Sequence, residues 1–174
     1  MSSIDEELAW MLPIEALEWV ENNIISGSKI LEFGSGKGSE RLSKNYRVFS
    51  IEHNSEWVDK YPTNYIHAPI VNHADQRFGS EVGWYDIEMV RSQLPDEEFS
   101  LIIIDGPPAD IGRSGILDHL WLLDNCRYIL IDDLHRKKEY MISQEVSKKC
   151  GLKCLHFAQS IHNSRQFGVF WREK

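Results

Sequence analysis

Apolar runs of strand length alternate with helical stretches along most of this chain, and that alternation limits the fold more than any other feature. The run Phe99–Asp105 (FSLIIID) predicts a strand buried on both faces, as in the centre of a parallel sheet. Further strands are predicted at residues 29–33, 47–51, 64–68 and 127–132, and helices at residues 13–23, 39–44, 55–60, 86–93, 115–123 and 136–150. The pattern is typical of an α/β protein.

The chain closes with two more predicted strands, at residues 152–158 and 166–172, without a helix between them. They are joined by a short loop around Asn163 and are therefore expected to pair antiparallel. Residues 71–85 show no clear period and are interpreted as a loop. We predict a seven-stranded, mostly parallel sheet with an antiparallel C-terminal hairpin and helices on both faces. The length of 174 residues fits a single domain spanning residues 1–174.

Composition narrows the classes of function. The net charge of −8 argues against nucleic acid as the main partner, because a phosphate backbone selects basic surfaces. The chain has no apolar run long enough for a membrane span, and its first residues, MSSIDEELAW, do not resemble a secretory signal. We therefore expect a cytoplasmic protein. Cys126, Cys150 and Cys154 form no CxxC pair, which favours reduced thiols over a zinc site.

A glycine-rich loop follows the first predicted strand, in the segment Glu32–Ser39 (EFGSGKGS). Glycine allows a sharp turn and a close approach to a ligand, and the helix that follows offers free N–H groups. The dinucleotide pattern G-x-G-x-x-G would need glycine at position 39, which is Ser39, and the spacing of a Walker loop is also absent.

A second acid, Glu52, ends the next strand, twenty residues after Glu32. In open α/β sheets a carboxylate at this place accepts hydrogen bonds from ribose hydroxyls. The alternative is that the glycines only mark a turn and that the two acids only face solvent.

Three aspartates end two adjacent strands. Asp105 follows the FSLIII run, and Asp132 and Asp133 follow the strand at residues 127–132. Parallel strands bring their carboxyl ends to one edge, so the three carboxylates should converge there. Three carboxylates suit a hard divalent cation, for which Mg²⁺ is the usual choice. The alternative role for Asp133 is to cap the helix that begins near Arg136.

The E-x-G-x-G-x-G loop, the spaced acid and the sheet pattern together resemble the class I S-adenosylmethionine (SAM)-dependent methyltransferases, over nearly the whole chain. Asp105 with the Asp132–Asp133 pair is similar to the metal-dependent O-methyltransferases of catechol, caffeoyl-CoA and macrocin type. The segment after the fourth strand, D-G-P-P-A-D-I-G-R, looks more like polysaccharide O-methyltransferases, including plant glucuronoxylan methyltransferases.

The resemblance implies roles for particular residues. The implied SAM-binding set is Glu32, Gly34, Ser35, Gly36, Gly38, Glu52, His53 and Asp105. Asp105, Asp132 and Asp133 are the implied metal ligands. Three residues are candidates for catalysis: Asp105 at the reaction centre, His135 as a base with an ordinary pKa of about 6.5, and Arg113 as a clamp for an acidic sugar or phosphate. The aromatic residues in Gly83–Asp86 either stack on a ligand or anchor their loop.

We therefore expect a methyltransferase whose acceptor is a hydroxyl on a small molecule or glycan. A cation on that hydroxyl would lower its pKa and orient it. Two alternatives remain open: a nitrogen acceptor on a small molecule or protein, which needs no metal, or a SAM-binding protein without catalytic activity. Many small enzymes of this kind complete the acceptor pocket with a second subunit, so a homodimer is compatible with the resemblance.

Overall fold

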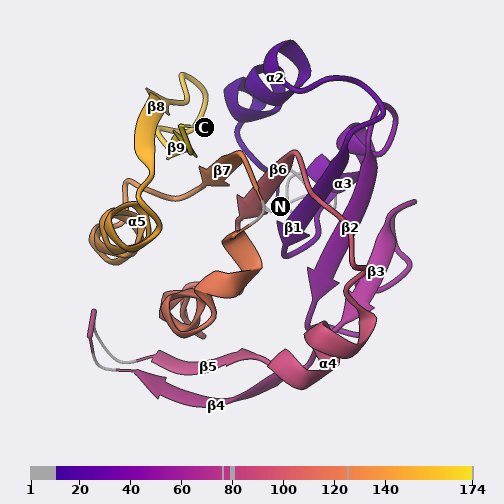
Figure 1. The fold of residues 1–174 in the computed structure, drawn as a ribbon, viewed down its shortest axis with the longest axis vertical. Helices are drawn as coiled ribbons and strands as arrows, with labels where there is room; N and C mark the ends of the chain where they lie inside the picture. Colours follow the sequence, from indigo (N-terminus) through magenta and orange to yellow (C-terminus); the bar gives the residue numbers. More distant parts are fainter. Residues whose placement is uncertain (1–10, 76, 79–80, 125, 174) are drawn as a thin grey trace.

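A seven-stranded sheet forms the centre of the molecule (Figure 1). The computed structural model describes residues 11–75, 77–78, 81–124 and 126–173. The strands of the sheet, in chain order, are β1 (Lys29–Phe33), β2 (Arg47–Glu52), β3 (Asn64–His67), β6 (Leu101–Ile104), β7 (Tyr128–Ile131), β8 (Lys153–Gln159) and β9 (Gln166–Trp171). Their order across the sheet is β3-β2-β1-β6-β7-β9-β8. The first five run parallel, and β9 pairs antiparallel with both β7 and β8, as the sequence predicts.

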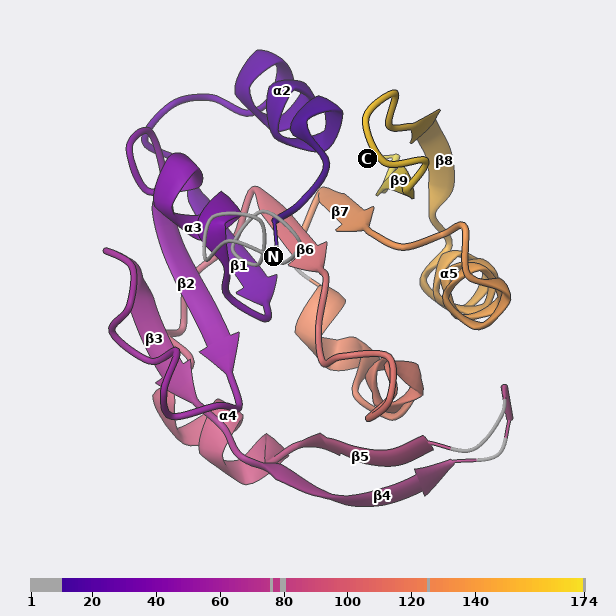
Figure 2. The same ribbon diagram turned by 180° about the vertical axis from the view of Figure 1, so that it is seen from behind.

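Helical elements cover both faces of this sheet (Figures 1 and 2). One face carries α2 (Ile14–Asn23) and α3 (Lys37–Leu42), and the other carries α4 (Ile87–Gln93), the 3-10 helices η1 (Ser114–Asp118) and η2 (Leu120–Leu123), and α5 (Lys137–Cys150). Strand β6 supplies both cores, because side chains alternate along a strand. Leu101 and Ile103 are buried with α2, whereas Ile102 and Ile104 are buried with the other helices.

The stretch predicted as a loop at residues 71–85 is instead largely a β-hairpin. Strands β4 (Ile70–Asp75) and β5 (Glu81–Tyr85) pair antiparallel in a separate two-stranded sheet. Its β5 end is fixed by Trp84 and Tyr85, which are both about 1% exposed and belong to the core below the main sheet. A two-stranded ribbon with one apolar end shows little alternation of apolar and polar residues, and the sequence therefore does not predict these two strands.

Three predicted helices differ from the observed elements. Residues 55–60 form turns, and the helix predicted at 39–44 begins earlier, at Lys37. The helix predicted at 115–123 is two short 3-10 helices separated at His119. The prediction for α5 is confirmed: it ends at Gly151, whose φ of 63° is the left-handed conformation that glycine adopts without strain.

The parallel strands place their carboxyl ends at one edge of the sheet. Asp105 and Asp132 are the first residues after β6 and β7, and Glu52 is the last residue of β2. The adjacent pairing of β1 with β2 and β6, and of β6 with β7, brings these acids and the loop after β1 to the same edge. Within the described residues, every helix is too short or too polar to cross a membrane.

Candidate functional site

A cavity of about 470 Å³ lies at the carboxyl edge of the sheet. Its lining residues come from both halves of the predicted site: Gly34, Ser35, Glu52, His53, Asn54, Trp57, Tyr85, Asp105, Gly106, Pro108, Ala109, Asp110, Arg113, Asp133, Arg136 and Arg165. A smaller hollow beside it is lined by Glu32, Gly36 and Gly38 together with Gly34 and Asp105. The glycine loop and the aspartates therefore share one edge, as the sequence predicts.

Gly34 occupies the position of the loop where the backbone conformation requires glycine. Its φ is 85°, and a Cβ there would lie 3.4 Å from the Cα of Gly106 in the loop after β6. Gly38 is different, because a Cβ there would meet only atoms at 3.6 Å or more. The close approach of the loops after β1 and β6 depends on Gly106, where a Cβ would lie 2.9 Å from the Phe33 carbonyl oxygen and 3.0 Å from the Cα of Gly34. This approach brings the predicted donor and acceptor sides together.

Glu32 is buried beneath the glycine loop, with 4% of its surface exposed. Its Oε1 accepts a hydrogen bond of 2.5 Å from the Ser50 hydroxyl. Burial raises the pKa of Glu32 to about 7, against the opposing effect of hydrogen bonds from Ser39 and Ser50. Glu32 therefore titrates near neutral pH and supports the loop from below.

Glu52 holds the glycine loop from its other side. Its Oε2 accepts hydrogen bonds from the Ser35 amide at 2.9 Å and the Ser35 hydroxyl at 2.8 Å. Its Oε1 accepts a bond from the Asn54 amide at 2.8 Å and lies 3.0 Å from His53 Nδ1. Burial alone would raise the pKa of Glu52, but these donors outweigh it and lower the pKa. The Ser35 hydroxyl and the His53 imidazole both line the cavity, so the Glu52 carboxylate is covered on that side by groups that also face the open space.

The three aspartates converge as predicted. One carboxylate oxygen each from Asp105, Asp132 and Asp133 lies within 4.8 Å of the others. Asp132 and Asp133 are buried, at 0% and 2% exposed, and only Asp105 retains substantial access to the cavity. Burial, followed by the charge of Asp132, raises the pKa of Asp105, and burial also raises the pKa of Asp132. Asp133 has a φ of 63°, an uncommon value for a residue other than glycine that often accompanies a functional constraint.

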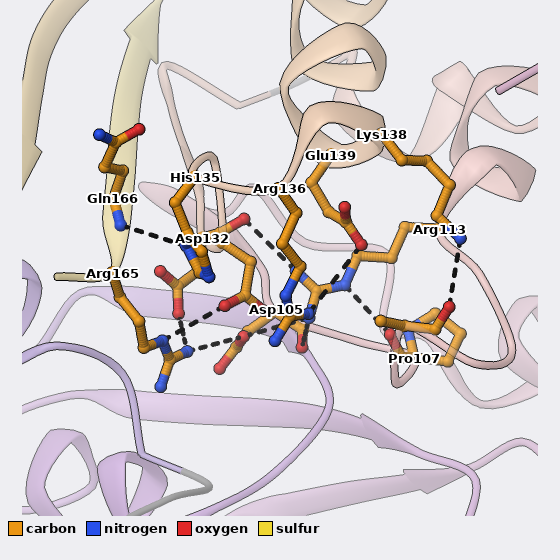
Figure 3. A network of polar contacts seen from close by, with 12 residues as sticks. Asp105, Pro107, Arg113, Asp132, His135, Arg136, Lys138, Glu139, Arg165 and Gln166 are labelled. Carbon is orange, nitrogen blue, oxygen red and sulfur yellow. Dashed lines mark hydrogen bonds and ion pairs between the residues drawn. The ribbon is translucent and has the colours of Figure 1, made fainter. Parts of the chain in front are cut away.

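Three arginines surround these carboxylates (Figure 3). Arg165 pairs with Asp132 through Nη2, which is also 3.6 Å from Asp105 Oδ1, and its Nε lies 3.3 Å from Asp133 Oδ1. Arg136 Nη1 lies 2.9 Å from Asp133 Oδ2. The mutual repulsion of the aspartates is therefore offset by guanidinium groups supplied by the chain itself.

Arg113 is the most deeply buried of these arginines, at 3% exposed. It donates to the Pro107 carbonyl at 3.0 Å, to the Asp105 carbonyl at 2.6 Å and to Asp133 Oδ2 at 2.9 Å. Burial disfavours its charge, but the neighbouring aspartates raise the pKa of Arg113, so it stays charged. These bonds fix the loop after β6, and Arg113 also lines the cavity, so its predicted contact with an acidic sugar or phosphate stays a prediction.

Two further expectations need correction. Asp133 does not cap α5, because the residue at the cap position is Arg136 and no side chain bonds there. His135 is exposed and is absent from the residues that line the cavity, and its Nδ1 faces the Gln166 amide at 3.5 Å. An imidazole in that position is poorly placed to act as a base inside the cavity.

The aspartates suit a cation in donor type, and among the described residues Asp132 Oδ1 has no hydrogen-bond partner. The arginines argue the other way, because Arg165 already contacts all three carboxylates. Since these carboxylates are already paired with guanidinium groups, the cluster as arranged does not fit Mg²⁺.

The sequence assigns no role at this site to Arg136 or Arg165, and it leaves open whether Tyr85, in the aromatic segment Gly83–Asp86, contacts a ligand. Arg165 immediately precedes β9, so the predicted antiparallel hairpin would place it at the carboxyl edge. Arg136 follows the Asp132–Asp133 pair closely in the sequence. Tyr85 lies on the hairpin strand β5, where side chains show no regular alternation.

Comparisons with known proteins define the fold class. No protein-family model matches the chain, and no curated protein matches its sequence. Among solved structures, magnesium protoporphyrin IX methyltransferase from Synechocystis PCC 6803, with bound SAM, matches at 11% identity with a TM-score of 0.59, covering 98% of this chain and 81% of that one.

Two further structures are similar. A methyltransferase from Pyrococcus furiosus matches at 14% identity with a TM-score of 0.57, covering 93% of this chain and 83% of that one. The E. cuniculi Mtq2–Trm112 complex, responsible for methylation of the translation termination factor eRF1, matches at 13% identity with a TM-score of 0.55, covering 92% and 93%. At such identities the likeness establishes the Rossmann-like methyltransferase fold and leaves the acceptor undefined.

The arginine contacts predict how the aspartate cluster responds to mutation. Replacing Arg165 with Met leaves Asp132 and Asp133 short of positive charge, so the free energy of unfolding should fall by about 3 kcal/mol. Millimolar Mg²⁺ should restore part of that loss in the variant and leave the wild type unchanged, as measured by urea unfolding with and without the ion. Arg41→Met is the control, because its pair with Glu21 lies at the surface and should contribute less than about 1 kcal/mol. Strong stabilisation of the wild type by Mg²⁺ would contradict this account.

The raised pKa of Glu32 predicts that the free energy of unfolding depends on pH. The folded protein keeps a proton on Glu32 up to about pH 7, whereas the unfolded chain releases it near pH 4.5. Wild-type stability therefore falls across that interval, and Glu32→Gln, which cannot titrate, should gain on the order of 2 kcal/mol relative to wild type. Urea unfolding at pH 5 and pH 8 measures the change. Glu52→Gln should run parallel to wild type between pH 5 and pH 8, because the pKa of Glu52 is lowered and its linkage acts only below about pH 4.5. Parallel curves for Glu32→Gln and wild type would refute the assignment.

Proposed function

We propose that this chain is a SAM-dependent methyltransferase that transfers the methyl group to an oxygen acceptor. The observation that carries the proposal is the single cavity of about 470 Å³ that joins the glycine loop and Glu52 to Asp105. A methyl transfer is an in-line displacement, so a donor site and an acceptor site must meet in one space. The fold shared with methyltransferases of known structure supports methyl transfer from SAM in general, whereas the oxygen acceptor rests on the site residues.

The donor side of the cavity is formed by the loops after β1 and β2. Glu52 binds the ribose hydroxyls. When the cofactor enters, these hydroxyls replace the Ser35 hydroxyl and the His53 imidazole as partners of the Glu52 carboxylate. Gly106 has no side chain and therefore lets the first loop lie close to the second, so that the cofactor's sulfur can lie near both loops. Glu32 supports this arrangement from the core and lines the smaller hollow beside it.

The acceptor side is formed by Asp105 and the arginine-bound cluster. Asp105 is the carboxylate of the three that reaches the cavity with substantial exposure, at 21% of its side chain. Burial raises the pKa of Asp105 to about 8, so Asp105 is ionised above that pH, and its carboxylate is then a stronger base than an ordinary aspartate and can accept the proton of an acceptor hydroxyl. Arg113 and Arg165 hold it in place and stabilise its ionised form.

The acceptor is proposed to be a small molecule or a glycan. The exposed face of Arg136, at 40% of its side chain, lies on the same cavity and offers a polar contact for sugar hydroxyls or an acidic substituent. A nitrogen acceptor is the second candidate. The observation that favours it is that arginines already pair with the aspartate cluster. An amine acceptor has no hydroxyl to activate, so its methylation does not need a metal at that cluster.

Cofactor binding can be tested without knowing the acceptor. Calorimetric titration with S-adenosylhomocysteine should give saturable binding with one site per chain. Glu52→Gln should weaken it by roughly tenfold to a hundredfold, because each lost charge-assisted hydrogen bond contributes about 1.5–3 kcal/mol. Glu56→Gln is the matched control, since Glu56 is exposed and outside the cavity lining. An intact protein that does not bind the ligand would refute the proposal.

The role of Asp105 separates the two acceptor classes. With labelled SAM and a panel of hydroxylated and amine acceptors, Asp105→Asn should reduce oxygen methylation by at least about a hundredfold. Binding of S-adenosylhomocysteine should persist in that variant, because the loss concerns proton transfer. If only amines are methylated, and the variant retains the activity, nitrogen is the acceptor. Binding without turnover on any acceptor would identify a non-catalytic SAM-binding protein.

A further inference from the structure

A buried hydroxyl without a partner lies at the centre of this site. Tyr85 is about 1% exposed and lines the cavity, yet its Oη has no hydrogen-bond partner among the described residues. Buried polar atoms are nearly always satisfied in a working protein, by another group, by water or by a ligand. The unmet hydroxyl therefore points to a bound molecule that completes it.

The position of this hydroxyl is defined by the two loops that meet beside it. A Cβ built on Gly106 would lie 2.4 Å from Tyr85 Oη and 3.0 Å from the Cα of Gly34. Gly34 belongs to the loop that would hold the donor, and Gly106 follows Asp105 on the acceptor side. The hydroxyl thus lies at the boundary between the two halves of the cavity, where the reacting atoms must meet.

Tyr85 is held there rigidly. Its ring packs against Phe33 and Trp84, with centroid separations of 5.9 Å and 5.2 Å, and it approaches His53 at 6.3 Å. Burial, followed by the charge of Glu52, raises the pKa of Tyr85 well above its usual value, so the hydroxyl stays neutral. A neutral hydroxyl has two lone pairs and one hydrogen, and it can serve a cation and an oxygen at once.

We propose that the Tyr85 hydroxyl oxygen contacts the sulfonium end of bound SAM and helps to orient the methyl group toward the acceptor. This inference rests on the proposed function. The sulfonium carries a positive charge that the product thioether lacks, so an oxygen directed at it binds donor more tightly than product. In a buried site that charge–dipole contact is stronger than it would be in water. Tyr85 would be a catalytic residue that touches the reacting centre.

The test compares the affinities for SAM and S-adenosylhomocysteine in wild type and Tyr85→Phe by calorimetry. The variant should bind SAM about tenfold more weakly and S-adenosylhomocysteine less than about threefold more weakly. The unliganded variant should be at least as stable as the wild type, because it loses only an unsatisfied hydroxyl. Tyr46→Phe is the matched control: its buried hydroxyl bonds to the carbonyls of Val20 and Ile24, so the variant should lose stability and keep the wild-type affinity ratio.

Each outcome separates this inference from the proposed function. An unchanged affinity ratio in Tyr85→Phe, with both ligands bound, overturns the role of Tyr85 and leaves the methyltransferase proposal standing. A Tyr85→Phe protein that fails to fold also overturns it, because the hydroxyl would then have a structural role. A wild type that binds neither ligand refutes the proposed function, and the role of Tyr85 with it.

Discussion

The ion pairing between Arg165, Arg113 and the aspartates at the carboxyl edge is the interaction on which the rest of the site depends. Adjacent parallel strands deliver Asp105 and Asp132 to the same place, and Asp133 follows at once. Burying carboxylates this close together is unfavourable unless nearby positive charges pair with them. The chain supplies these charges from distant segments, the loop after β6 and the turn before β9, so the folding of the C-terminal hairpin completes the site.

That pairing also explains the asymmetry of the cavity. Asp132 and Asp133 are buried in ion pairs with arginines and hold the loops in place, whereas Asp105 remains accessible from the cavity. On the opposite side, Glu52 is satisfied by the glycine loop until hydroxyls from a ligand replace its outer partners. The proposed function gives these two carboxylates different tasks, binding a donor and accepting a proton, and their different burial and neighbouring charge are consistent with that division.

Sequence alone could predict the sheet, its closing hairpin and the convergence of Gly34, Glu52 and the aspartates, because strand ends and loop lengths fix those positions. It could not predict how the aspartates are compensated. Arg165 lies 33 residues from Asp132 in the chain and contacts it only after β9 has paired with β7. The place of Tyr85 could be narrowed only to two alternatives, a ligand contact or a loop anchor, because the hairpin β4–β5 has one apolar end and no regular alternation that would place its tyrosine at the cavity.

In the proposed methyltransferase, donor and acceptor meet in one cavity whose aspartates are neutralised by arginine. A crystal structure of the chain grown with S-adenosylhomocysteine and magnesium chloride would show whether this arrangement exists. We expect the ribose on Glu52, the sulfur between Gly34 and Gly106, and Arg165 still paired with Asp132. A ligand bound elsewhere, or a magnesium ion on the three aspartates with Arg165 displaced, would contradict this arrangement.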